Sequence, residues 1–187
     1  MFVKICGITN REDALDAVDA GARAIGFVFY DASPRGVTAE AIKPWIDQIP
    51  PEIWKVGVFV NETPVRIEEI ALRLKLDVAQ LHGAETPENH PRGLRVWKAF
   101  RAAPPSDYPA EAILLDGPGS GRTFDWATVK DNSRPIIVAG GLTPENVAEA
   151  VSKTNPWGVD TASGVESSPG RKDRNRMKMF IKAALHS

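Results

Sequence analysis

Eight short apolar segments punctuate this 187-residue sequence, and a helical or broken segment follows each of them. The apolar segments are residues 3–5, 24–30, 54–60, 77–81, 94–100, 112–116, 135–139 and 157–160. They lack a strict apolar–polar alternation, as is typical of strands in a parallel sheet that is covered on both faces. Eight such strands without a break in composition predict a compact (β/α)8 TIM barrel, an α/β fold, with residues 1–187 as one domain. An open flavodoxin-like sheet would suit the length better, but it needs only about five strands.

The segments between the strands predict helices of unequal length. Thr9 and Glu12 have the spacing of a capping box, which predicts that Thr9 caps a helix over residues 11–20. Pro44 is expected to divide the helix after the second strand. The segments after the fourth and fifth strands are rich in proline and glycine, so we expect curtailed helices at both places.

Charge and composition exclude several classes of partner. The formal net charge is −1 with acidic and basic residues interspersed, so no broad field favours nucleic acid or an anionic membrane. The basic residues between 171 and 182 are interleaved with apolar ones and fit the solvated face of an amphipathic helix. A single cysteine cannot form an internal disulfide, and the apolar runs are too short to span a bilayer. No leader precedes the first strand and no spacing of ligands suggests a metal site, so we expect a cytoplasmic, metal-free protein.

Chemically useful residues follow four strands that a closed barrel places next to one another. Strands six, seven, eight and one are neighbours in such a barrel, so Asp116, Gly140-Gly141, Ser163-Gly164 and Cys6 share one mouth. Glycines let the main chain approach a phosphate closely, and exposed amides supply donors. A Gly-Gly turn is weak evidence alone, but together with a Ser-Gly turn after the next strand it predicts a phosphate site.

Cys6 and Asp116 are the candidate base and acid. A lone cysteine is more often a small buried hydrophobe, but Cys6 ends a strand beside the predicted phosphate site. Lys4 lies on the same strand face, where its charge would favour the thiolate and give a base near neutral pH. Asp116 could be a turn carboxylate, yet it follows three apolar residues, and an apolar surround would keep it protonated as a proton donor. An acid and a base beside a sugar phosphate are typical of an isomerase.

Three further residues after strands are candidates for binding the rest of the substrate. Arg35 offers a guanidinium fork for a carboxylate, although an ordinary surface arginine fits equally well. His82 could be a polar contact or a structural histidine. Asp160 could orient a ligand hydroxyl or only hold its loop. The residues alone leave these alternatives open.

Short motifs are spread along nearly the whole chain. They are VKICGIT at 3–9, GFVF at 26–29, SPR at 33–35, VGVFVN at 56–61, QLHG at 80–83, LLD at 114–116, GRTFDW at 121–126, AGGL at 139–142, VD at 159–160 and SGVE at 163–166. In this order they resemble the phosphoribosylanthranilate isomerase family of tryptophan biosynthesis, whose members are compact eightfold barrels.

The resemblance implies an Amadori rearrangement of N-(5-phosphoribosyl)anthranilate to 1-(2-carboxyphenylamino)-1-deoxyribulose 5-phosphate, without a metal or organic cofactor. Asp116 would protonate the ribose ring oxygen as it opens, and Cys6 would remove the C2 proton from the resulting Schiff base. Arg35 would face the anthranilate carboxylate, and the backbone around Gly140-Gly141 and Ser163-Gly164 would hold the phosphate. We expect a monomer that acts on this small phosphorylated molecule.

The chain departs from the family pattern in the curtailed helices after the fourth and fifth strands and at two further places, and two alternatives to the family function are considered. The loop after Asp116, residues 117–121, is shorter than usual, and because that loop normally covers the substrate, closure and turnover are in question. Gly36 stands where an aromatic residue often follows the arginine. A broader sugar-phosphate isomerase that also acts on the related intermediate of histidine biosynthesis is one alternative, but such relatives use two aspartates as acid and base, one of them at the position of Cys6. A barrel that only binds a phosphorylated ligand is the other, and the presence of both Cys6 and Asp116 argues against it.

Overall fold

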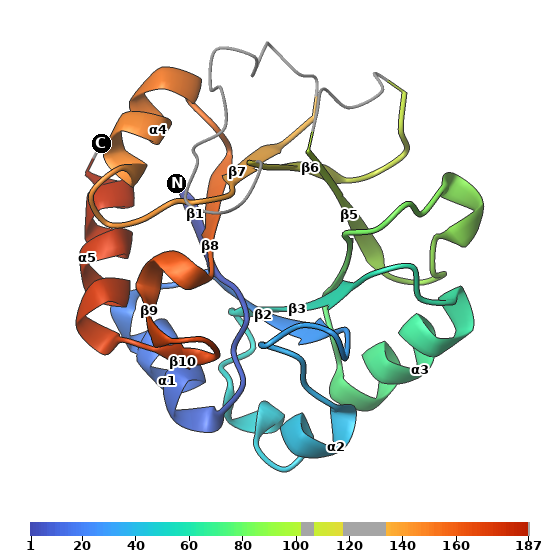
Figure 1. Cartoon of the computed structure of the whole chain (residues 1–187). Helices are drawn as coiled ribbons and strands as arrows, with labels where there is room; N and C mark the ends of the chain where they lie inside the picture. The colour runs from blue at the N-terminus through green and yellow to red at the C-terminus, as the bar shows by residue number, and fades with distance from the viewer. Residues whose placement is uncertain (102–106, 118–133, 187) are drawn as a thin grey trace.

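Eight parallel strands close into a barrel in which each strand pairs with the next along the chain and β8 pairs with β1. The computed structural model describes residues 1–101, 107–117 and 134–186. The strands are β1 (Phe2–Ile5), β2 (Ala24–Phe29), β3 (Trp54–Phe59), β4 (Val78–Leu81), β5 (Arg95–Phe100), β6 (Ala112–Asp116), β7 (Ile136–Ala139) and β8 (Gly158–Thr161). Their boundaries lie within one residue of the predicted segments, and the predicted (β/α)8 barrel is confirmed (Figure 1).

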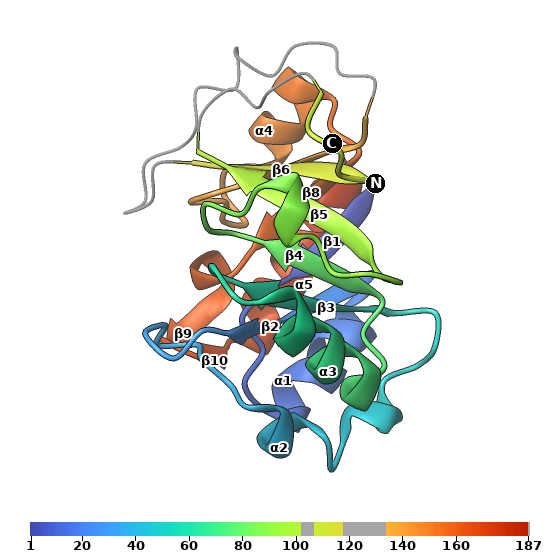
Figure 2. The ribbon, with the colours of Figure 1, turned by 90° about the vertical axis from the view of Figure 1, so that its right-hand side faces the viewer.

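Helices and turns lie outside the ring of strands (Figure 1). The α-helices are α1 (Arg11–Ala20), α2 (Ala39–Ile42), α3 (Pro64–Leu74), α4 (Val147–Thr154) and α5 (Arg174–Leu185). Three single 3-10 turns and one hairpin are also described: η1 (Ile46–Gln48), η2 (Pro87–Asn89), η4 (Ser163–Val165), β9 (Glu166–Ser168) and β10 (Arg171–Lys172). Figure 2 shows the β9–β10 hairpin projecting from the same end of the barrel as the loop that follows β2. The sequence did not predict this hairpin, because its strands are short and polar.

The first helix begins at a cap that differs from the predicted one. The helix α1 has the predicted bounds, but Asn10 is its N-cap and accepts a hydrogen bond from a first-turn N–H at 2.9 Å. Thr9 instead donates its hydroxyl to the carbonyl oxygen of Gly170, which lies 2.6 Å away in the β9–β10 hairpin. The predicted capping box of Thr9 and Glu12 is therefore wrong, because a contact from a distant part of the chain occupies the threonine.

The short helices are found where the prolines predict them. Pro44 falls between α2 and η1 and divides that segment. Between β4 and β5 the structure has a single helical turn, η2, which confirms the curtailed helix there. The segment after β5 is described only from residue 107. The predicted glycine-rich loop beyond Gly117 and the helix predicted near residues 124–126 lie outside the described residues.

Aromatic side chains close the N-terminal end of the barrel. Phe2 stacks on Trp157 with ring centroids 4.4 Å apart, and it packs edge-on against Trp54 and Trp97. Trp97 belongs to an interior cluster that also contains Ala24, Val56, Val78, Ala99, Ala112, Leu114, Ile137 and Ala139. A second, larger apolar cluster joins the strands to the helices around them. With one end filled in this way, side chains that bind or react are placed at the carboxyl ends of the strands.

Candidate active site

A cavity of about 600 Å³ opens at the carboxyl ends of the strands. Its lining includes eight of the nine predicted site residues, namely Cys6, Arg35, His82, Asp116, Gly140, Gly141, Asp160 and Ser163. The ninth, Gly164, is not part of the lining. Barrel closure therefore brings residues from both ends of the sequence into one site.

The thiol of Cys6 is held between the two strands that flank β1. The backbone N–H of Cys6 donates to the carbonyl oxygen of Thr161 at the end of β8, at 2.8 Å. On the other side lies Gly26 of β2, where a Cβ atom would come within 2.7 Å of Cys6 Sγ and 3.1 Å of Lys4 Cε. The thiol has room because residue 26 carries no side chain.

Lys4 is fully buried below Cys6, and its Nζ donates to Oδ2 of Asp160 at 2.8 Å. Burial acts to lower the pKa of Lys4, but the charge and hydrogen bond of Asp160, together with the interaction with Cys6, outweigh it and raise this pKa above its ordinary value. Burial raises the pKa of the Cys6 thiol, and the Lys4 charge opposes this rise without overcoming it. The predicted net lowering of the Cys6 pKa is therefore wrong, because desolvation of the buried thiol outweighs the Lys4 charge and the Asp160 carboxylate adds to the rise.

Asp116 ends β6 with its carboxyl group against His82. Nε2 of His82 lies 3.0 Å from Oδ2 of Asp116. The other ring nitrogen, Nδ1, lies 3.5 Å from the amide nitrogen of Gln80. The apolar surround predicted for Asp116 is wrong, because the carboxyl group faces a histidine and the cavity. His82 can orient the candidate acid through this contact.

The Gly140-Gly141 turn brings bare main chain to the cavity beside Asp116. The two glycines have φ values of 81° and 69°, which glycine adopts without steric cost. A Cβ on Gly140 would overlap the backbone nitrogen of Gly117 and would lie 3.0 Å from Oδ1 of Asp116. The side chain of Asn146 donates to the carbonyl oxygen of Gly141 at 3.0 Å and holds the turn.

Ser163 and Gly164 begin the turn η4 but have different roles. Ser163 lines the cavity. A Cβ on Gly164 would overlap the carbonyl oxygen of Leu142, so glycine is needed for this close approach. The Gly164 carbonyl accepts two hydrogen bonds from Arg176 of α5, each at 3.1 Å. The Cα and the carbonyl group of Gly164 therefore pack η4 against Leu142 and α5.

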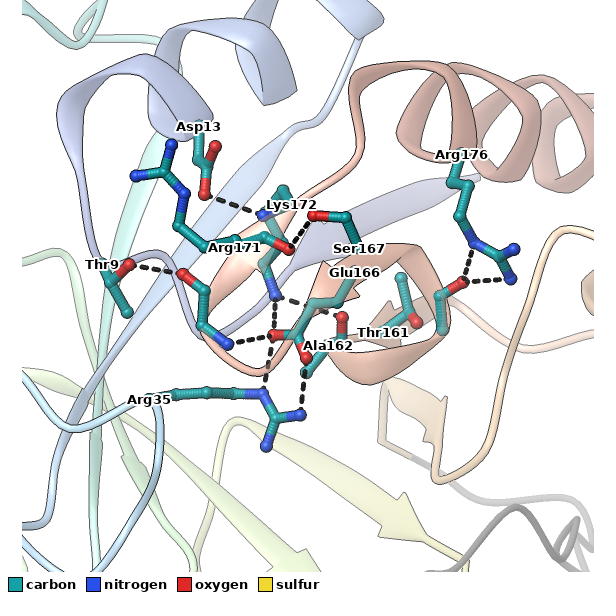
Figure 3. A network of polar contacts seen from close by, with 12 residues as sticks. Thr9, Asp13, Arg35, Thr161, Ala162, Glu166, Ser167, Arg171, Lys172 and Arg176 are labelled. Carbon is teal, nitrogen blue, oxygen red and sulfur yellow. Dashed lines mark hydrogen bonds and ion pairs between the residues drawn. The ribbon is translucent and has the colours of Figure 1, made fainter.

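Arg35 reaches the cavity from the loop after β2 and is paired with a carboxylate of the chain itself (Figure 3). Its Nε and Nη2 atoms donate to the two carboxylate oxygens of Glu166, at 2.8 and 2.7 Å. Glu166 also accepts from Nζ of Lys172 at 2.8 Å. The sequence reasoning assigned no role to Glu166 or Lys172, although Glu166 ends the SGVE motif.

Two buried acceptor atoms in the cavity wall have no hydrogen-bond partner among the described residues. They are Oδ1 of Asp160 and Oε1 of Gln80. A buried unpaired acceptor is unfavourable and is normally satisfied by a ligand or an ordered water. The sequence reasoning missed Gln80. The available signal was its position two residues before His82, which puts both side chains on one face of the strand.

A protein-family model described as N-(5'-phosphoribosyl)anthranilate isomerase matches residues 3–183 of the chain. The N-(5'-phosphoribosyl)anthranilate isomerase of Solibacter usitatus is 51% identical over 196 residues, which cover 98% of this chain and 97% of the relative. The chain belongs to the phosphoribosylanthranilate isomerase family. The matched range contains every predicted site residue, from Cys6 to Gly164.

Solved structures of the phosphoribosylanthranilate isomerase family have the same fold over the whole chain. One is a complex with reduced 1-(o-carboxyphenylamino)-1-deoxyribulose 5-phosphate, with a TM-score of 0.92, 41% identity and full coverage of both chains. Another contains monomers of the dimeric Thermotoga maritima enzyme, with a TM-score of 0.88, 39% identity and full coverage of both chains. Among the described residues of the present chain, no group of three or more His, Cys, Asp or Glu could hold a metal ion. None of the helices in the described ranges is long and apolar enough to cross a membrane.

Proposed function

We propose that the chain converts N-(5-phosphoribosyl)anthranilate into 1-(2-carboxyphenylamino)-1-deoxyribulose 5-phosphate, with Cys6 as general base and Asp116 as general acid. This Amadori rearrangement is an aldose–ketose isomerisation in tryptophan biosynthesis. The observation that carries the residue assignment is the common cavity, which Cys6 enters from the end of β1 and Asp116 from the end of β6. These strands are separated by β7 and β8 in the barrel, so the two groups approach a bound substrate from different sides.

The reaction begins with two proton transfers at two places on the sugar, which the proposed acid and base carry out. Asp116 donates a proton to the ribose ring oxygen, and the C1–O bond breaks as the nitrogen lone pair forms the protonated Schiff base. Cys6, as the thiolate, then removes the C2 proton, and the electrons of that C–H bond form the C1–C2 double bond of an enolamine. Proton return to C1 and loss of the hydroxyl proton give the ketose. Positioned side chains are sufficient for these steps, and we expect no cofactor.

The remaining cavity residues are proposed to hold the two ends of the substrate. Arg35 binds the anthranilate carboxylate. The backbone around Gly140-Gly141 and Ser163-Gly164 binds the phosphate, and the close packing of Gly164 shapes the turn that presents Ser163. His82, Asp160 and Gln80 bind the ribose hydroxyl groups. These hydroxyl groups would donate hydrogen bonds to the unpaired acceptor atoms of Asp160 and Gln80.

Two expectations about the cellular state of the chain stay predictions. We expect a cytoplasmic monomer that binds neither nucleic acid nor membrane, whereas the Thermotoga maritima relative is described as dimeric. Light scattering on the purified chain, across a range of concentrations, measures the oligomeric state directly.

The test is the loss of substrate fluorescence when purified chain is added to freshly made N-(5-phosphoribosyl)anthranilate, corrected for spontaneous hydrolysis. Cys6→Ala and Asp116→Asn should each lower kcat by about 100- to 10,000-fold, and both should still bind the reduced product. Near-normal rates in either variant would overturn that residue's assignment. If the unaltered chain binds the reduced product without turning over the substrate, the barrel is a binding protein. Equal turnover of the related histidine-pathway intermediate would favour the broader isomerase.

A further inference from the structure

Arg35 forms a polar cluster with two residues of the β9–β10 hairpin (Figure 3). We call it the Arg35 cluster, and it consists of Arg35, Glu166 and Lys172. One Glu166 oxygen accepts from Nε of Arg35 and Nζ of Lys172, both at 2.8 Å, and the other accepts from Nη2 of Arg35 at 2.7 Å. The side chains of Lys172 and Glu166 are 0% and 5% exposed. Glu166 and Lys172 therefore lie in a medium where charge and geometry matter much more than in water, while the Arg35 side chain is 22% exposed.

Arg35 is fixed along its whole length before any substrate arrives. Its aliphatic stem crosses Gly7, where a Cβ atom would come within 2.5 Å of Arg35 Cδ. The backbone N–H of Arg35 donates to Oγ of Ser33 at 3.1 Å. Glu166 occupies one N–H of Nε and one of Nη2, and a guanidinium has five such donors in a rigid plane. The unused donors are thus held in one orientation at the cavity wall.

Lys172 is held from three directions. Its Nζ also donates to the carbonyl oxygen of Ala162 at 3.1 Å, and its backbone N–H donates to a carboxylate oxygen of Asp13 at 2.9 Å. Burial lowers the pKa of Lys172, while the hydrogen bond and charge of Glu166 act in the opposite direction. The β9–β10 hairpin carries both Glu166 and Lys172, so the hairpin places the two charges behind Arg35 as one unit.

The charges of the Arg35 cluster do not balance. Arg35 and Lys172 are two cations, and among the described residues Glu166 is the carboxylate that pairs with both side chains, while the carboxylate of Asp13 meets only the backbone N–H of Lys172. A buried excess charge is unfavourable until an opposite charge joins it. An anion bound at the free edge of Arg35 would complete the balance, whereas an uncharged group there would leave the excess in place.

We propose that Glu166 and Lys172 are positioning residues that make Arg35 select substrates whose aromatic amine carries a carboxylate. Glu166 sets the direction of the guanidinium, and Lys172 supplies the second positive charge that only an anionic ligand balances. The proposal rests on the proposed function, since it concerns recognition of the anthranilate end of that substrate. In this proposal the β9–β10 hairpin, which lies outside the barrel, contributes to substrate recognition.

The experiment compares two reduced product analogues by calorimetry. One carries the 2-carboxyphenylamino group, and the other carries a phenylamino group without the carboxylate. We expect the unaltered chain to prefer the carboxylated ligand by about 30-fold or more, since removing one partner of a buried charge pair costs a few kcal/mol. Glu166→Gln should reduce that preference to about threefold, mainly by weakening the carboxylated ligand.

Two further variants test the role of Lys172 and provide a control in the same hairpin. Lys172→Met leaves Arg35 and Glu166 paired and neutral, so it should also lower the preference for the carboxylate, and it serves if Glu166→Gln does not fold. Ser167→Ala lies in the same hairpin, where the hydroxyl contacts the carbonyl oxygen of Arg171, and should retain the preference. Equal weakening of both ligands by Glu166→Gln, or an unchanged preference in both charge variants, would overturn the proposal. Absence of isomerase activity in the unaltered chain would instead count against the proposed function.

Discussion

Lys4 of β1 and Asp160 of β8 are partners in register across the seam that closes the barrel, and their side chains form an ion pair at 2.8 Å. The side chain of Lys4 is 0% exposed and that of Asp160 is 8% exposed. The pair therefore joins the first strand to the last at the floor of the cavity, beside Cys6. Its contribution to stability depends on both charges being present.

Removing one member of this pair should destabilise the chain strongly. Lys4→Met leaves the carboxylate of Asp160 buried without its partner, and we expect a loss of about 3 to 5 kcal/mol in the free energy of unfolding. Without Lys4, burial would raise the pKa of Asp160 in the folded chain above its value in the unfolded chain. The folded chain would therefore hold Asp160 mainly in its protonated form. The stability of Lys4→Met should consequently rise as the pH falls toward the unfolded-state pKa of about 4. Urea unfolding at several pH values measures this.

The double variant Lys4→Met with Asp160→Asn is the control for that effect. With both charges removed, much of the lost stability should return, because no buried charge is left unpaired. Activity should stay low, since Asp160 lies in the cavity wall. A single variant as stable as the unaltered chain would show that the ion pair contributes little.

The reactivity of Cys6 should increase with pH well into the alkaline range. Burial raises the pKa of this thiol, so the thiolate is scarce at neutral pH and increases about tenfold per pH unit below that pKa. The chain has one cysteine, and mass spectrometry can therefore follow its alkylation by iodoacetamide without interference. We expect no plateau below the ordinary thiol pKa of about 8.5. A rate that levels off near pH 7 would contradict the upward shift, and saturating reduced product should protect the thiol.

The glycine beside the thiol gives a test of geometry. In Gly26→Ala the new Cβ would meet Cys6 Sγ at 2.7 Å, and displacing a catalytic atom by about 1 Å lowers the rate about 100-fold. Gly57→Ala is the matched control, because its Cβ would meet Leu76 Cδ1 at the same 2.7 Å, among the apolar contacts outside the site. Both variants should lose stability, but only Gly26→Ala should lose most of its kcat. Equal kcat values in the two variants would argue against the assigned place of the thiol.

A second buried ion pair holds the shortened segment between β4 and β5. Nζ of Lys98 lies 2.7 Å from Oε2 of Glu85, and both side chains are at most 3% exposed. Burial acts to raise the pKa of Glu85, but hydrogen bonds from Lys98 and the backbone of Asn61 outweigh it and lower this pKa. We expect Lys98→Met to lose about 3 to 5 kcal/mol in the free energy of unfolding.

The pH dependence of this second pair follows from the lowered pKa of Glu85. Ionised Glu85 contributes to the free energy of unfolding above the pKa that it has in the unfolded chain, about 4.3. This contribution is lost as the pH falls through the lower pKa that Glu85 has in the folded chain. The stability difference between the unaltered chain and Glu85→Gln should therefore shrink below about pH 4. Unfolding by urea between pH 3 and 7 checks this, and a constant difference would contradict it.

Local patterns were sufficient for the strands and for the eight predicted residues that line the cavity. Cys6, Asp116 and Gly140 each follow an apolar run, and parallel strands in a closed barrel all end at the same mouth. Once eight strands are counted, the topology places these residues together. The resemblance of the motifs to a known family indicated the reaction, because the pattern of apolar residues alone does not specify a substrate.

The polar contacts that tune the site were decided only by the tertiary structure. Thr9 meets Gly170 instead of capping its helix, and Arg35 meets Glu166, which lies 131 positions along the chain. Lys4 meets Asp160 at a separation of 156 positions, and burial of the Cys6 thiol raises its pKa despite the Lys4 charge. The sequence by itself determined which residues reach the mouth, because strand ends follow from local hydrophobicity. Which charges face each other there depends on barrel closure and the fold of the β9–β10 hairpin, and burial gives those pairings their strength.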